Sequence, residues 1–201
     1  MAKTIQNEIG EKVIAAVREV ASHEIHDVPF WAGELAHMES NSLRQTVAET
    51  IYGARWLYKL GLVFLTRDDE QNAHSRAQIS EYSAAIEAVL TDMIVYAHGN
   101  NRLSGTQFQK NLKGDPINWV VPRYRVPNKY ELVSRLTFAW MIKVAHEEGI
   151  ISSPLERQLG WLRNKRNEIH LISRTRYAFT PTSKNAYNAV LNTIRETKAW
   201  K

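Results

Sequence analysis

Five residues near one end of a predicted helix are of types that bind phosphate or transfer protons. They are Arg163, Asn164, Arg166, Asn167 and His170, all within the run RNKRNEIH. Arginine offers a planar fork of N–H donors that matches phosphate oxygens, and histidine exchanges a proton near neutral pH. Such groups can cleave RNA without a metal, because the 2′-hydroxyl attacks the neighbouring phosphate once a base has removed the hydroxyl proton. A cation then stabilises the charge on the phosphoryl oxygens.

The helical period predicts how these side chains are arranged. At roughly 100° per residue, the helix that starts near Pro154 carries one apolar stripe. The stripe consists of Leu155, Leu159, Leu162 and Ile169. Arg166 falls within it, while Arg163, Asn167 and His170 follow at i, i+4 and i+7 along its edge. We therefore expect a line of polar groups beside the buried side of this helix.

A buried arginine on an apolar stripe needs a partner, because a desolvated cation loses hydration worth several kcal/mol. The partner of Arg166 could be a carboxylate on a preceding long helix, and Glu81, Glu87 and Asp92 are the candidates. Two alternatives are a cleft that binds phosphate and the surface of a second subunit. A plainer interpretation of the whole cluster is a solvated helix flank with one buried ion pair.

Other groups in the chain admit functional and structural interpretations. Two further segments, RYR at 123–125 and RTRY at 174–177, each combine two arginines with a tyrosine. The arginines could bind RNA phosphates and the aromatic rings could stack on bases. In the second, we expect Arg174, Arg176 and Tyr177 to position RNA or to form a solvated turn. His23, His26 and His37 could in principle approach a metal, but their spacing is not that of a zincin helix, and we expect none.

The elements that must position these groups are helices. Apolar periodicity predicts helices over residues 5–20, 43–65 and 68–99, with an irregular turn over 26–33 that precedes the second. Ser40 is expected to cap the second helix and Asp68 with Asp69 the third, which should end at a left-handed Gly99. Glycines and prolines over 99–128 predict a long loop with a short helix at most.

Three more helices are predicted over about 130–148, 154–172 and 183–200, and Gly149 should end the first of them. We find no internal repeat and no strand-like alternation. The predicted fold is all-α, an up-and-down bundle of four to five core helices. Its core spans residues 71–201, and residues 1–70 form an N-terminal helical extension, with packing on the core as one option.

Composition narrows the class of protein. The 26 Lys and Arg against 21 Asp and Glu give a formal net charge of +5, which favours an anionic partner such as RNA. The chain has no cysteine, which excludes disulfides and a cysteine nucleophile and favours a reducing cytoplasm. Neither a signal peptide nor a membrane span is expected from the sequence.

The run from Leu162 to Leu171 resembles the signature of the HEPN superfamily, the higher eukaryotes and prokaryotes nucleotide-binding domain. In that family an arginine, usually followed by a polar residue, precedes a histidine by four to six intervening positions. Arg163 and Asn164 fit this pattern with His170, whereas the pair at 166–167 lies too close to the histidine and would assist. The segments 82–90 and 136–151 resemble the helices before the motif, so the resemblance covers about residues 76–200.

The resemblance implies a four- or five-helix bundle that dimerises and brings the arginine and histidine of two subunits into one cleft. Many members are ribonucleases of toxin–antitoxin, abortive-infection and CRISPR systems. The expected function is therefore a metal-independent endoribonuclease without a cofactor, with Arg163 and His170 catalytic and RNA, a second copy and an antitoxin as partners. The alternatives are a non-catalytic module that binds nucleotide, RNA or a protein, and a structural helical adaptor.

Overall fold

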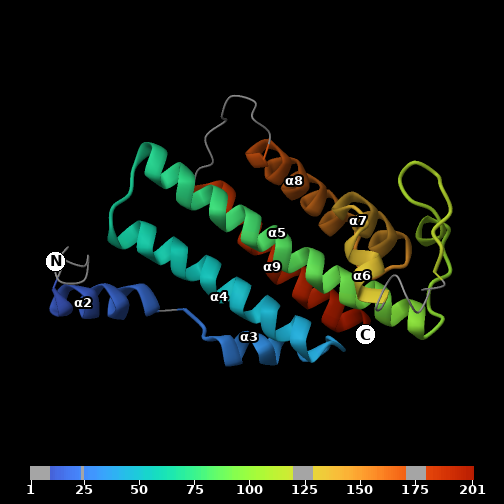
Figure 1. The fold of residues 1–201 in the computed structure, drawn as a ribbon, viewed down its shortest axis with the longest axis horizontal. Helices are drawn as coiled ribbons and strands as arrows, with labels where there is room; N and C mark the ends of the chain where they lie inside the picture. The colour runs from blue at the N-terminus through green and yellow to red at the C-terminus, as the bar shows by residue number, and fades with distance from the viewer. Residues whose placement is uncertain (1–9, 24, 120–128, 171–179) are drawn as a thin grey trace, which may run out of the picture.

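The computed structural model describes residues 10–23, 25–119, 129–170 and 180–201, and these fold as an all-α bundle, as predicted (Figure 1). The described residues form eight α-helices, one 3₁₀ turn and no strand. The helices are α2 Glu11–Ser22, α3 Val28–Glu34, α4 Asn41–Val63, α5 Asp68–Gly99, α6 Lys129–Ser134, α7 Phe138–Glu147, α8 Ser153–His170 and α9 Thr180–Trp200, and the 3₁₀ turn η1 is Gln107–Gln109.

Helix α5 is the centre of the bundle. It contacts α4 and α9 on one side and α6, α7 and α8 on another. Figure 1 shows α4, α5 and α9 running alongside one another, with α7 and α8 above α5. Because helices cover α5 on several sides, its whole predicted apolar stripe is buried. The stripe comprises Ile79, Tyr82, Ile86, Val89, Leu90, Met93 and Ala97.

The described part of the first seventy residues contributes to the same core as the later helices. Trp31 from α3, Leu35 directly after it, and Ile51 and Ala54 from α4 belong to one hydrophobic cluster with residues of α5 to α9. Each of the four is at most 3% exposed. Helix α2 lies against α4, but Ala21 is its one buried side chain. The segment expected as an extension is therefore packed on the bundle through α3 and α4.

Two helix predictions were wrong in their local detail. The turn predicted over 26–33 is helix α3, because Asp27 accepts a hydrogen bond from the Phe30 N–H at 2.9 Å and Pro29 lies in the first turn, where proline favours a helix start. The helix predicted over 130–148 is interrupted. Thr137 has an extended backbone, and its hydroxyl accepts from the Trp140 N–H, which starts α7 as a separate helix.

The predicted cap of α4 and the predicted glycine after α7 are confirmed, whereas both ends of α5 differ. Ser40 caps α4, and Gly149, two positions after the last residue of α7, has a φ of 69°. At α5 the cap position is Arg67, whose side chain makes no capping hydrogen bond. The carboxylates at 68–70 lie in the first turn, where their negative charges interact favourably with the positive end of the helix dipole. At the other end Asn101, not Gly99, takes the left-handed conformation.

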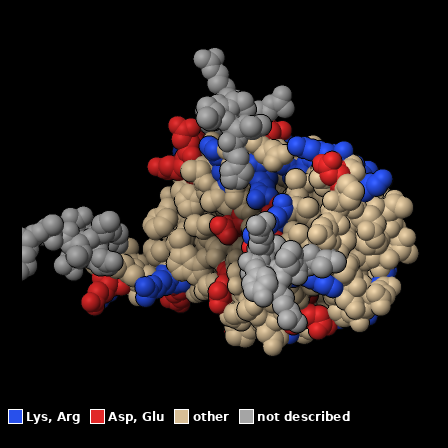
Figure 2. Space-filling view, turned by 45° about the vertical axis from the view of Figure 1, so that its right-hand side comes forward, with Lys and Arg blue, Asp and Glu red and all other residues tan. Residues whose placement is uncertain are grey.

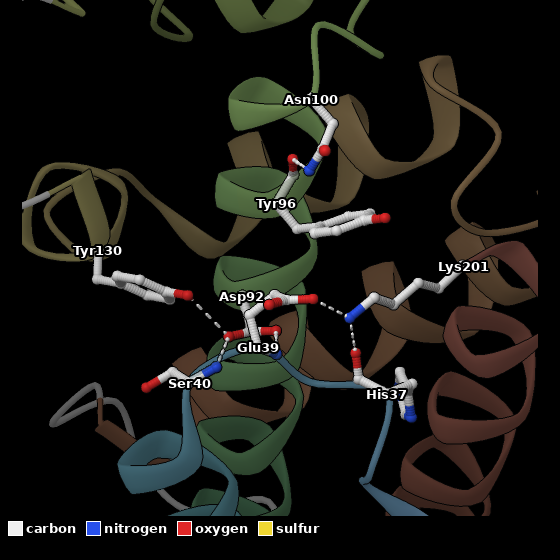
Figure 3. A network of polar contacts seen from close by, with 8 residues as sticks. All are labelled: His37, Glu39, Ser40, Asp92, Tyr96, Asn100, Tyr130 and Lys201. Atoms are coloured by element: carbon white, nitrogen blue, oxygen red, sulfur yellow. Dashed lines mark hydrogen bonds and ion pairs between the residues drawn. The ribbon is translucent and has the colours of Figure 1, made fainter.

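A buried carboxylate on α5 fixes the start of α4. Asp92 is 0% exposed, and its Oδ2 and Oδ1 accept the backbone N–H groups of Glu39 at 2.8 Å and Ser40 at 3.0 Å. The Tyr130 hydroxyl donates to Oδ1 at 3.1 Å, so three donors from two other parts of the chain meet one side chain (Figure 3). Burial, together with this carboxylate, raises the pKa of Tyr130 to about 12.

The C-terminal residue joins the same network (Figure 3). Lys201 Nζ donates to the His37 carbonyl at 2.5 Å and pairs with the Glu39 carboxylate. The His37 ring in turn contacts the Thr197 hydroxyl of α9 at 2.9 Å. Burial, with the positive charge of Lys201, lowers the pKa of His37, so its ring is held in the neutral form. These contacts tie the end of α9 to the α3–α4 turn.

Candidate functional site

The predicted polar line lies along the second half of α8, beside α5. Leu155, Leu159 and Leu162 are each at most 2% exposed, so the apolar stripe of α8 faces the core as predicted. Ile169 is partly buried against the same core. The polar residues between them lie at the boundary with solvent, where a side chain can contact both the bundle and a ligand.

Arg166 contacts the carboxylate of Glu87, one of its three predicted partners. Its Nη1 pairs with Glu87 Oε1, and the two side chains are 29% and 24% exposed. Of the other two candidates, Asp92 caps α4 and Glu81 is exposed on α5. The cation on the apolar stripe is therefore compensated by a charge on α5, which makes its partial burial tolerable.

Arg163 differs from Arg166. Its Nη2 donates to the neutral side-chain oxygen Oδ1 of Asn164 at 3.0 Å. No carboxylate of the described residues forms an ion pair with it, and its buried Nε has no hydrogen-bond partner there. A buried donor without an acceptor costs on the order of 1–3 kcal/mol. Among the described residues, Arg163 is therefore a positive charge that no carboxylate compensates, which is the kind of group that binds phosphate.

The remaining polar residues of this helix segment differ from Arg163. Lys165 pairs with Glu168 at 2.9 Å across one helical turn, so its charge is compensated at the surface. Asn167 is exposed. Arg163 differs from these described residues because it has both a permanent positive charge and a buried donor without a described hydrogen-bond partner.

His170 is the last residue of α8, and only its backbone is described. Seven positions along a continuous helix place two Cα atoms about 10 Å apart and within about 20° of the same line. The backbone thus keeps Arg163 and His170 on one side of α8. The predicted RNA-positioning residues Arg174, Arg176 and Tyr177, and the segment 123–125, lie outside the described residues.

Arg76 on α5 is a cation near the site that the sequence analysis missed. Its Nη2 donates to the carbonyl of Ile169 at 2.7 Å, one residue before His170. The last carbonyls of a helix have no helical partner, and a cation there also favours the negative end of the dipole. A signal was present: Arg76 and Glu87 are eleven positions apart, about three turns, and so share one side of α5.

A groove of about 480 Å³ adjoins the Arg166–Glu87 pair, and we call it the Glu87 groove. Its lining includes Ala84, Glu87 and Ala88 of α5, Tyr130 and Glu131 of α6, and Met141 of α7. In the view of Figure 2, Lys and Arg atoms gather below the uppermost grey segment, with carboxylates beside them. Positive and negative groups thus lie next to each other on the face seen there.

The histidines considered as metal ligands serve other contacts. His26 stacks on Phe30 with ring centroids 3.8 Å apart, and His37 contacts Thr197. Among the residues that the structure describes, no three His, Cys, Asp or Glu side chains are placed to hold a metal ion.

In the described part of the chain, none of the helices has the length and apolarity needed to cross a bilayer. Comparison of the chain with family models, with curated proteins and with solved structures gives no match.

Proposed function

We propose that this protein is a metal-independent endoribonuclease of the HEPN type that cleaves single-stranded or loop RNA. The observation that carries the proposal is the state of Arg163, a permanent cation with a buried, unpartnered Nε and no ion pair among the described residues. It lies on the same side of one helix as His170, seven positions away. These are the two groups that cleavage by an internal hydroxyl requires.

The reaction needs no group beyond the RNA and these side chains. His170 takes up the 2′-hydroxyl proton as that oxygen attacks phosphorus, and the bond from phosphorus to the 5′-oxygen breaks. The protonated His170, directly or through a water molecule, returns the proton to the leaving 5′-oxygen, so the products are a 2′,3′-cyclic phosphate and a 5′-hydroxyl. The Arg163 guanidinium donates hydrogen bonds to the non-bridging oxygens, whose negative charge rises in the transition state.

The neighbouring residues take supporting roles in this proposal. Arg166 is engaged by Glu87 and orients α8 against α5, and Arg76 holds the end of α8 at Ile169. Asn164 orients the Arg163 guanidinium through their hydrogen bond. Arg174, Arg176 and Tyr177 would bind the RNA beyond the cleavage site, as the sequence suggests.

The biological setting is also a proposal. The resemblance to HEPN ribonucleases suggests a homodimer whose subunits share one cleft, and a role as a toxin or in defence with a cognate antitoxin. The lack of cysteine suits the reducing cytoplasm.

The test is cleavage of a labelled single-stranded RNA in excess EDTA by the wild type and by Arg163→Ala and His170→Ala. We expect each substitution to reduce the rate at least about a hundredfold. Mass spectrometry should find cyclic phosphate and 5′-hydroxyl ends. Arg157→Ala is the matched control, because Arg157 is an exposed arginine on the same helix, and it should cleave at the wild-type rate.

Equal cleavage by the wild type and both variants would refute the proposal. RNA binding without cleavage, weakened by Arg163→Ala, would instead identify a non-catalytic RNA-binding module. Absence of both cleavage and binding would favour a structural adaptor.

A further inference from the structure

The Glu87 groove is suited to a flat, mostly apolar ligand that carries hydrogen-bond donors. Ala84 and Ala88 line it from α5, Tyr130 from α6 and Met141 from α7. Its volume of about 480 Å³ is in the range of small-molecule sites. Aromatic and thioether side chains pack well on the faces of flat rings.

The two carboxylates of the groove are both compensated. Glu87 pairs with Arg166, and Glu131 pairs with Arg135 on the next turn. The groove therefore carries little net charge, which disfavours a cationic side chain as the occupant. Glu87 remains a hydrogen-bond acceptor, because a carboxylate has about four lone-pair positions and its ion pair with Arg166 does not use them all. A neutral ligand with N–H donors fits this combination.

Among the nucleobases, guanine matches a carboxylate best. Its N1–H and its 2-amino group are adjacent donors that can meet both oxygens of one carboxylate. Adenine and cytosine each place an acceptor nitrogen next to their amino group, and uracil flanks its N3–H with two carbonyl oxygens. A carboxylate has no proton to offer those acceptors at neutral pH, so it discriminates against the other three bases.

The position of the groove links it to the proposed phosphate site. Glu87 lines the groove and also contacts Arg166, which is three residues from Arg163 on α8. A nucleotide bound with its base against Glu87 would therefore direct its phosphate toward the face of α8 that carries Arg163. The base and phosphate of one nucleotide would be recognised from α5 and α8 together.

We propose that the Glu87 groove binds a guanine base and that this contact sets the nucleotide preference of the enzyme. The inference rests on the proposed function in assigning the bound guanine to an RNA substrate. Guanine recognition by the groove itself can be measured without any cleavage.

The experiment measures binding of 5′-GMP and 5′-AMP to the full chain by isothermal titration calorimetry. We expect GMP to bind at least about tenfold more tightly than AMP, because one bidentate contact to a base discriminates against the wrong base by about this factor. Glu87→Gln should remove this preference, because the glutamine amide can still accept from Arg166 but presents a donor to guanine. Glu81→Gln, an exposed position on the same helix, is the matched control and should bind as the wild type does.

A second variant tests the groove without altering its charges. Ala84→Leu places a larger side chain at an exposed position of the lining and should weaken GMP binding while circular dichroism stays unchanged. If GMP and AMP bind equally, or if neither variant affects GMP, the inference is wrong. Binding of a Lys- and Arg-rich peptide in place of GMP, blocked by Ala84→Leu, would overturn it in favour of a protein partner.

The cleavage assay separates this inference from the proposed function. Selective GMP binding without RNA cleavage would support the groove assignment and refute the nuclease. If the wild type cleaves preferentially at guanine and Glu87→Gln cleaves at all bases alike, both the nuclease and the guanine site are supported. Cleavage with no base preference, together with equal binding of GMP and AMP, would leave the nuclease standing and refute the guanine site.

Discussion

Replacing Asp92 with alanine should destabilise the protein through the start of α4. The carboxylate accepts two backbone N–H groups, at 2.8 and 3.0 Å, and the Tyr130 hydroxyl at 3.1 Å. Alanine leaves all three donors without this acceptor. A hydrogen bond to a charged group contributes roughly 1.5–3 kcal/mol, and water can reach the partly exposed donors, so we expect a total loss of about 3–4 kcal/mol.

The measurement is urea-induced unfolding followed by far-ultraviolet circular dichroism. For a chain of this size a loss of about 3–4 kcal/mol corresponds to a decrease in Tm of roughly 10 °C. Amide hydrogen exchange should also accelerate at residues 39–43, because the first turn of α4 loses its anchor. Asp69→Ala on the same helix is the control and should cost less than about 1 kcal/mol, since Asp69 is exposed in the first turn.

A variant whose free energy of unfolding lies within about 1 kcal/mol of the wild type would contradict this role of Asp92. Unchanged exchange rates at the start of α4 would contradict it equally. Either result would show that water or a rearranged side chain satisfies these donors as well as the carboxylate does.

Two further predictions concern charged groups. A double-mutant cycle of Arg166→Ala and Glu87→Ala, measured by urea unfolding, should give a coupling energy of about 1–2 kcal/mol because the pair is partly buried, and additive effects would contradict the ion pair. The free energy of unfolding should fall as the pH decreases below 6.5, because burial lowers the pKa of His37 in the folded state and the unfolded chain therefore binds the proton more readily. His37→Gln should flatten this dependence without removing it, since burial also lowers the pKa of His98, and an unchanged pH profile would exclude His37 as a cause.

Local sequence patterns were enough to predict most helices and the buried apolar stripe of α8. The stripe of α5 is buried at every predicted position, and Leu155, Leu159 and Leu162 face the core as their spacing indicated. These features follow from the helical period, which depends on neighbours three or four positions away. The exceptions were α3 and the break before α7, where a single capping side chain decided the outcome.

Sequence alone showed that Arg166 lies within an apolar stripe and needs a partner, but three carboxylates were possible. Only the tertiary structure selected Glu87, left Arg163 without a carboxylate partner among the described residues, and brought Arg76 to the end of α8. Such contacts join residues that are seventy or more positions apart. They depend on how the helices pack, which no local period encodes, and for this reason the state of the candidate site was decided by the fold.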